Sequence, residues 1–242
     1  MTLRCTARAA RLLAAAALLA APLAAQVGRD PARSPYRDIL YGNGWTVMAG
    51  RVYGDGGPLR LSPNSGTSFS VRYDVRFSGL LQGFVGLSFL GTERQVLAPD
   101  DSVAHRFSGP FDATVWVPEA GLQFNLTGPK TWHRLAPYVA ASFGAAVGES
   151  TPQDTSEFTF GTKLMVSPSA GVRAYLSERV HLRVDYRLYY WKMKYPNTWL
   201  DEPAAQPGDV GNGERNAPVQ SVDALDDWVF TPSLRVGLGI AF

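Results

Sequence analysis

The sequence ends with Pro232-Ser-Leu-Arg-Val-Gly-Leu-Gly-Ile-Ala-Phe242, and this stretch decides the fold. Counted backwards from the end, every second residue is apolar: Phe242, Ile240, Leu238, Val236 and Leu234. The residues between them are small or polar. A period of two residues is typical of a β-strand with two unlike faces. The sequence therefore predicts a terminal strand with one apolar face and one polar face.

Seven further segments show the features of strands, and the alternation is clearest in 68–77 and 180–190. The predicted strands are 44–53, 68–77, 80–89, 114–126, 136–147, 158–176, 180–190 and 228–242. Long polar connections at 54–67, 91–113, 148–157 and 196–227 alternate with shorter ones at 78–79, 128–135 and 177–179. This alternation is typical of a membrane barrel with extracellular loops and periplasmic turns.

The N-terminal residues predict export. Arg4, Arg8 and Arg11 accompany an Ala/Leu-rich run over 12–21, and small residues at 23–25 offer a cleavage site. The alternative, a membrane anchor, needs about 20 apolar residues, more than this run contains. We therefore predict a signal peptide over 1–25, a short periplasmic segment over 26–44 and a barrel over 45–242.

Charge and cysteine content exclude several classes of function. Removing residues 1–25 leaves 20 Lys and Arg residues against 21 Asp and Glu residues, so the exported chain has no basic excess. Nucleic-acid binding is therefore not expected. Cys5 is the only cysteine and lies in the predicted signal peptide, which leaves no disulfide and no thiolate metal site. We expect neither a metal nor a cofactor.

The chain resembles the small eight-stranded outer-membrane proteins, the group that includes the OmpA membrane domain, OmpX and OmpW. The resemblance covers residues 45–242 and rests on strand number, loop alternation and the terminal Phe242. It implies an all-β fold, an eight-stranded antiparallel up-and-down transmembrane β-barrel in the bacterial outer membrane. It also implies that the barrel-assembly machinery reads the last strand, including Phe242, Ile240 and Leu238. Outer-membrane lipid and lipopolysaccharide are the expected surroundings, and we expect a monomer.

A soluble lipocalin-like barrel is the alternative fold, because it has the same strand number with the opposite polarity. Aromatic residues near the strand ends favour the membrane barrel, since a bilayer selects an aromatic girdle at each interface. The predicted inner girdle is Trp45, Phe77, Phe124, Trp132, Tyr138, Tyr175 and Phe242. The predicted outer girdle is Tyr53, Phe89, Phe158, Phe160, Tyr190, Trp191, Tyr195, Trp199 and Trp228.

The polar face predicts a network of charges in the lumen. Its expected cations are Arg72, Arg76, Lys163, Arg173, Arg183, Arg187 and Arg235, and its expected acids are Asp74, Glu119 and Asp185. The cations outnumber the acids, so the lumen holds water, or loop acids such as Glu149, Glu157, Asp226 or Asp227 fold inward, or some residues face outward. We expect Arg235 and Asp185 to pair across neighbouring strands. The network either fills the lumen as a structural element or lines a conduction path.

No catalytic motif is present, and His105 is the only histidine on the predicted outer side. We therefore predict a non-enzymatic envelope protein with a structural or surface-interaction role through its loops. A narrow porin-like channel for small solutes is the alternative, and a lipid-modifying enzyme is a second one. The acidic loop 196–227 could bind Ca²⁺ and bridge to lipopolysaccharide, although it lacks the full calcium-loop pattern.

Overall fold

The computed structural model describes residues 34–151, 154, 156, 158–203 and 216–242. The predicted signal peptide lies outside the described residues, as do Glu157 and part of the acidic loop, including Asp209 and Glu214. The chain divides into two compact units, Met1–Tyr36 and Arg37–Phe242, and the account that follows concerns the second. In the described part of the chain no helix is both long and apolar enough to cross a bilayer.

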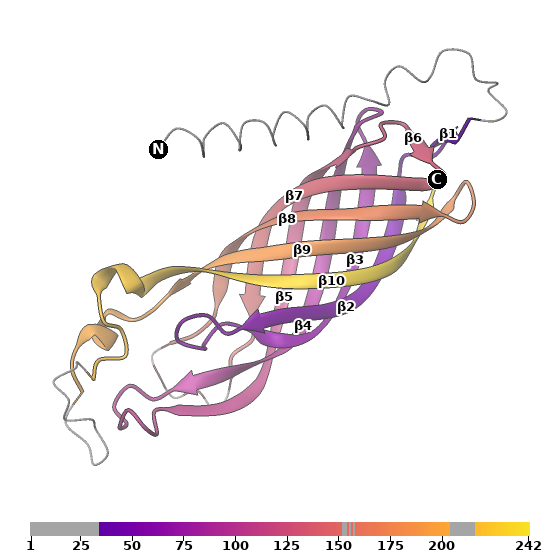
Figure 1. Cartoon of the computed structure of the whole chain (residues 1–242). Helices are drawn as coiled ribbons and strands as arrows, with labels where there is room; N and C mark the ends of the chain where they lie inside the picture. Colours follow the sequence, from indigo (N-terminus) through magenta and orange to yellow (C-terminus); the bar gives the residue numbers. More distant parts are fainter. Residues whose placement is uncertain (1–33, 152–153, 155, 157, 204–215) are drawn as a thin grey trace, which may run out of the picture. The chain divides into compact units, whose positions relative to one another are not determined.

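Eight long antiparallel strands close into a barrel (Figure 1). Neighbours in sequence pair with one another, and β10 closes the circle by pairing with both β9 and β2. The long strands are β2 (Gly44–Asp55), β3 (Asn64–Arg76), β4 (Leu81–Leu97), β5 (Phe107–Asn125), β7 (Leu135–Gly148), β8 (Thr162–Tyr175), β9 (Val180–Lys194) and β10 (Asp226–Ala241). Short elements are β1 (Tyr36–Asp38), β6 (Lys130–Trp132) and the 3₁₀ helices η3 (Asn197–Leu200) and η4 (Val222–Leu225). The predicted fold class is confirmed.

The two ends of the barrel differ in their connections. The connections at 77–80, 126–134 and 176–179 lie at the end that also holds Phe242, which we call the turn end (Figure 1). At the opposite end, which we call the loop end, lie the described residues of the connections 56–63, 98–106, 149–161 and 195–225. The alternation of long and short connections seen in the sequence is present only in part, because the connection 126–134 is as long as 98–106 and longer than 56–63.

The prediction of a long loop over 91–113 is wrong, because most of these residues extend the β4–β5 hairpin. Glu93 pairs with Asp112 and Leu97 pairs with Phe107, which leaves only residues 98–106 as a loop. Beyond the bilayer both faces of a hairpin can be polar, so hydropathy no longer distinguishes a strand from a loop there. The predicted strand 158–176 is also shorter, since β8 begins at Thr162.

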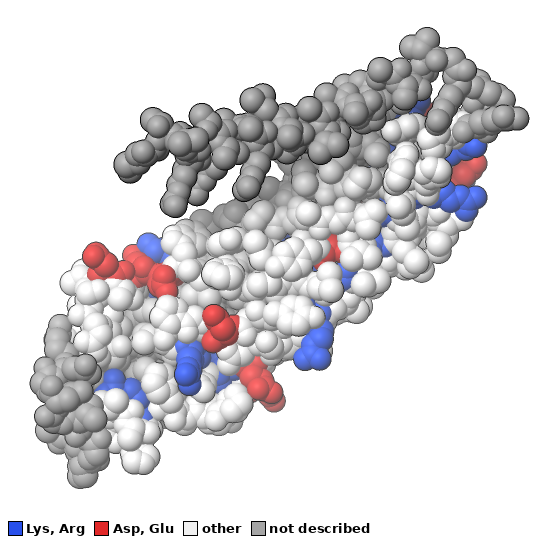
Figure 2. Space-filling model, in the orientation of Figure 1, with Lys and Arg blue, Asp and Glu red and all other residues white. Residues whose placement is uncertain are grey.

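The barrel is polar inside and apolar outside. On β10, Val236 and Leu238 are 52% and 50% exposed, whereas Ser233 and Arg235 are 0% and 1% exposed. Much of the barrel face visible between the two ends in Figure 2 is free of Lys, Arg, Asp and Glu. A soluble barrel buries apolar side chains and exposes polar ones, so the lipocalin-like alternative is wrong. Closed barrels with an apolar outer band are the form in which strands cross a membrane.

The aromatic girdles are present, but some predicted members belong to the interior. Trp45, Phe77 and Phe242 are exposed at the turn end, and Tyr53 and Trp228 are exposed at the loop end. Tyr138 and Tyr175 of the predicted inner girdle are buried, as are Phe158, Phe160, Trp191, Tyr195 and Trp199 of the predicted outer girdle. The inward face of the strands changes from polar to apolar near the loop end, so aromatic character alone did not reveal which way these side chains point.

Candidate functional site: the barrel interior

The interior is built from the inward face of each strand. Along β9, the inward residues from the turn end to the loop end are His181, Arg183, Asp185, Arg187, Tyr189, Trp191 and Met193, all at most 3% exposed. Period 2 puts every second residue on this face. The inward face of β9 is therefore charged near the turn end and apolar near the loop end. The other strands contribute side chains to the same two layers.

Asp185 is the centre of the charged layer. It lies directly opposite Arg235 in the β9–β10 ladder, and the two side chains form an ion pair. The Tyr138 hydroxyl donates a hydrogen bond of 2.8 Å to Asp185, and Arg187 Nε lies 3.5 Å from it. Arg187 also pairs with Glu119 across the lumen. The pairing of Arg235 with Asp185 that the sequence suggests is therefore present.

A second group of charges lies nearer the turn end, around Asp74. Arg72 donates two hydrogen bonds to Asp74, at 2.8 and 2.6 Å, and Arg183 Nη1 lies 3.4 Å from the same carboxylate. Gln123 Oε1 accepts hydrogen bonds from both arginines, at 2.7 and 2.6 Å. The Gln123 amide nitrogen donates to Asn125 at 2.8 Å. Gln123 is fully buried, and it was missed because a neutral amide gives no charge signal in the sequence.

Two predicted members lie at the ends of the interior and outside the charged layer. Arg76 is half-buried at the turn end, where its guanidinium donates to the carbonyl oxygens of Ile39 and Tyr41, each at 2.9 Å. Lys163 is half-buried at the loop end, with its Nζ 5.8 Å from the centre of the Phe158 ring.

The charged layer of the described barrel therefore holds more arginines than carboxylates. Its buried members are Arg72, Arg173, Arg183, Arg187 and Arg235 with Asp74, Glu119 and Asp185. Five cations against three acids leave an excess of two positive charges. Part of this excess meets neutral acceptors and aromatic faces, as where the Arg72 guanidinium lies 3.4 Å from the centre of the Phe84 ring.

An apolar layer closes the lumen at the loop end. Its buried members include Val52, Leu61, Leu90, Val115, Val117, Met165, Trp191, Met193, Tyr195, Trp199 and Val219. Trp199 comes from η3, and its carbonyl accepts a hydrogen bond of 3.0 Å from the Val219 amide, so these two residues of the connection between β9 and β10 are held together in the apolar layer. Burial raises the pKa of Tyr195 to about 12. Buried side chains of the described residues thus fill both layers of the interior.

Among the described loop acids, Asp154 and Asp227 face the interior, and Glu157 lies outside the described residues. Asp227, one of the expected acids, is half-buried on the same face of β10 as Val229. Asp154 pairs with Arg94 at 2.6 Å, and both side chains are buried at the loop end. Glu149 and Asp226 instead accept from Trp116 and Lys192 on the exposed side. Arg94 was missed because it fell in a predicted loop. The alternation of Leu90, Thr92 and Arg94 on one face could have revealed it.

The histidines lie far apart in the chain, and the described residues contain no group of His, Cys, Asp and Glu that could hold a metal ion. Ser102 Oγ lies 3.0 Å from His105 Nδ1 in the turn between β4 and β5. No carboxylate of the described residues is hydrogen-bonded to His105, so this contact lacks the acid that orients the histidine in a catalytic triad. His133 lies in the β6–β7 turn, and His181 is buried in the lumen.

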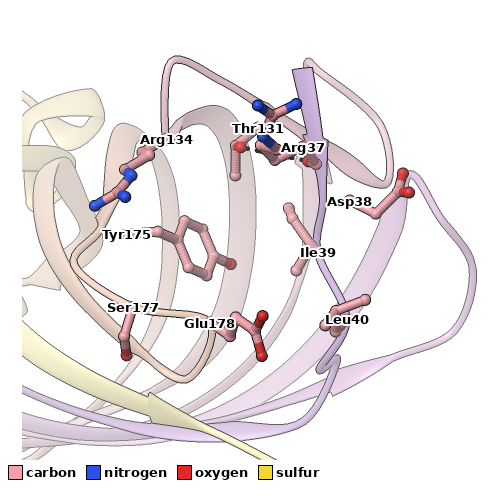
Figure 3. A pocket seen from close by; sticks show the side chains of 9 residues that line it. All are labelled: Arg37, Asp38, Ile39, Leu40, Thr131, Arg134, Tyr175, Ser177 and Glu178. Atoms are coloured by element: carbon pink, nitrogen blue, oxygen red, sulfur yellow. Dashed lines mark hydrogen bonds between the residues drawn. The ribbon is translucent and has the colours of Figure 1, made fainter. Parts of the chain in front are cut away.

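A pocket of about 580 Å³ opens at the turn end (Figure 3). It is lined by Arg37, Asp38, Ile39, Leu40, Thr131, Arg134, Tyr175, Ser177 and Glu178. His133 and Arg134 form the two-residue turn between Trp132 and Leu135 with φ values of +48° and +66°. Such turns favour Asn-Gly, so the backbone here adopts a costly conformation that holds Arg134 at the pocket. The sequence did not predict this pocket.

No protein-family model matches the chain, and no curated protein sequence matches it. Several solved structures do. Neisserial surface protein A matches with a TM-score of 0.50 at 14% identity, over 86% of this chain and 98% of that one. The outer membrane protein OprG from Pseudomonas aeruginosa matches with a TM-score of 0.47 at 12% identity, over 84% and 97%. The N-terminal β-barrel domain of Pseudomonas aeruginosa OprF matches with a TM-score of 0.44 at 10% identity, over 84% and 98%.

At such low sequence identities a structural match is evidence for the fold alone. Of the three matches, the one to Neisserial surface protein A carries the argument, because its TM-score reaches 0.50. The fold of the chain is that of the small eight-stranded outer-membrane barrels, as the sequence predicts. The apolar outer face of the barrel is an independent physical reason to place the chain in the outer membrane. The chain is therefore a transmembrane β-barrel of the outer-membrane type.

Proposed function

We propose that this protein is a non-enzymatic, non-conducting barrel of the bacterial outer membrane that acts through its loop end, as a structural or surface-interaction protein. The observation that carries the proposal is the filled lumen. Charged side chains at most 8% exposed and an apolar layer around Trp191 lie one behind the other along the barrel. A solute would have to displace both layers.

The loop end supports an interaction role because it contains an extended hairpin and connections that are held by specific contacts. The β4–β5 hairpin continues well past the apolar band, and the Arg94–Asp154 pair holds the connection after β7 against it. A hydrogen bond between Val219 and Trp199 ties together two described parts of the connection between β9 and β10. An ordered platform loses less entropy on binding than a mobile loop does.

We further propose that the surroundings of this barrel are outer-membrane lipid and lipopolysaccharide, that the protein is a monomer, and that the assembly machinery reads Phe242, Ile240 and Leu238. Ile240 and Leu238 are exposed on the outer face of β10, and Phe242 is exposed at its end. The described acids of the segment 196–227 form no group that could hold a metal ion, so a Ca²⁺ bridge to lipopolysaccharide phosphates is not part of this proposal.

A narrow channel is the alternative that the positive excess of the lumen favours, since such a lumen would attract anions. Conductance across planar lipid bilayers separates the two functions. We expect the wild-type protein to give no discrete conductance steps. A variant with Glu119, Arg187 and Trp191 all changed to Ala is the matched control, because it removes an ion pair and a large side chain from the two closing layers. Conductance steps of the wild-type protein as large as those of this variant would overturn the proposal.

A further inference from the structure

The surplus positive charge is concentrated in the turn-end half of the lumen. Arg72 and Arg183 share the single carboxylate of Asp74. Arg173 is 3% exposed and donates to the neutral Asn125 at 2.7 Å, and no carboxylate among the described residues pairs with it. In the other half, Arg187 and Arg235 meet two carboxylates and are balanced. A negative charge is therefore missing near Arg173.

The same region holds buried polar atoms that have no hydrogen-bond partner among the described residues. They are Arg72 Nη1, Arg173 Nε, Thr46 Oγ1 and both ring nitrogens of His181. Each guanidinium nitrogen carries at least one N–H, a hydroxyl carries one, and a histidine ring carries at least one. Buried donors are normally paired, so this group calls for an acceptor.

Strand register brings these residues together. Thr46 lies opposite Arg72 on one side and opposite Gly239 on the other. His181 lies opposite Gly239, and Arg173 lies opposite Arg183 in the next row. A Cβ atom at Gly239 would lie 2.3 Å from His181 Cε1 and 2.8 Å from Thr46 Oγ1, so the glycine leaves room for these two side chains to approach each other.

Tyr175 lies between this group and the turn-end pocket. Its ring centre is 5.3 Å from that of His181, and the Arg173 guanidinium carbon lies 5.9 Å from the Tyr175 ring centre. The same ring lines the pocket, where Figure 3 shows it between Arg134 and Glu178. A rotation of one aromatic side chain would therefore connect the buried donors with the outside.

We propose that a chloride-sized inorganic anion binds in the barrel among Arg72, Arg173 and His181, and enters from the turn-end pocket past Tyr175. An anion accepts from several donors at once and supplies the missing negative charge. A water molecule could accept two of the hydrogen bonds but would leave the charge surplus in place. The residues around it are at most 3% exposed, so a large anion has no room there.

The direct test is crystallography of the full chain in detergent with sodium bromide in place of sodium chloride. We expect an anomalous bromide peak in contact with the Arg72 and Arg173 guanidinium groups. A water-sized peak without anomalous signal at that position, in crystals where bromide is visible elsewhere, would overturn the proposal.

The second test measures the thermal unfolding midpoint at equal ionic strength in sodium chloride and in sodium gluconate, whose anion is too large to enter. We expect chloride to raise the wild-type midpoint by about 2–4 °C. The variant Arg173→Gln should lose this difference, whatever its own stability. The control Arg179→Gln removes an exposed arginine at the same end and should keep it. Equal midpoints in the two salts, or the same difference in all three proteins, would contradict the proposal.

Discussion

Asp185→Asn tests whether the charged layer stabilises the barrel. The side chain is fully buried, pairs with Arg235 and accepts a hydrogen bond of 2.8 Å from Tyr138. Asparagine keeps the volume and removes the charge. Arg187 would retain Glu119, so the uncompensated charge would fall on Arg235. Removing one partner of a buried ion pair costs about 3–5 kcal/mol, and we expect a loss of that size in the free energy of unfolding.

Reversible unfolding in urea, followed by tryptophan fluorescence in lipid vesicles, measures this loss. The control is Asp226→Asn, which breaks an exposed ion pair with Lys192 at the end of the same β9–β10 ladder and should change the unfolding curve little. The double variant Asp185→Asn with Arg235→Gln should lose less than the sum of the two single changes, because it leaves no lone charge. If Asp185→Asn unfolds like the Asp226→Asn control, the network is not structural.

Two further predictions concern the outer face and the end of β10. Val236→Arg puts a charge on an apolar position that is 52% exposed near the middle of β10, and should cost about 2–4 kcal/mol of unfolding free energy in vesicles. Val222→Arg, at a position that is 70% exposed outside the long strands, should cost almost nothing, and equal effects of the two changes would mean that Val236 does not face lipid. Deleting Phe242 should lower the fraction of the protein that migrates in the folded form in cell envelopes more than Phe230→Ala does, although Phe230 is equally exposed on the same strand. Equal folded fractions would remove the assembly role of the terminal residue.

The sequence could predict the strands and their two faces because both follow from a local period of two. The predicted strand 68–77 corresponds to β3, which ends at Arg76, and Arg72 and Asp74 face inward as its alternation predicts. The polarity of the barrel does not follow from the period alone, because the same alternation fits a lipocalin-like barrel. The structure decides it, since Leu234, Val236 and Leu238 are all exposed. Which residues lie opposite each other depends on the closed ladder, and the sequence could only suggest the partner of Asp185.

The loop end was less predictable because its contacts join distant segments. Arg94 and Asp154 are 60 residues apart, and neither lies in a predicted strand. Trp191 continues the inward face of β9 beyond Arg187, but an aromatic residue near a strand end is equally typical of the lipid interface. Only the closed barrel distinguishes the two positions, because it shows where the interior changes from charged to apolar.

The inward face of β10 contains this change within the stretch that predicts the fold. From the turn end it presents Gly239 and Gly237, then Arg235, then Ser233 and Thr231, and finally Val229. The small residues make room for side chains of neighbouring strands, as Gly239 does for His181. Arg235 joins the charged layer, and Val229 joins the apolar one. Because the two layers are separate along the strand and depend on different interactions, a substitution that loosens one leaves the other in place, and closure of the lumen does not rest on any single side chain.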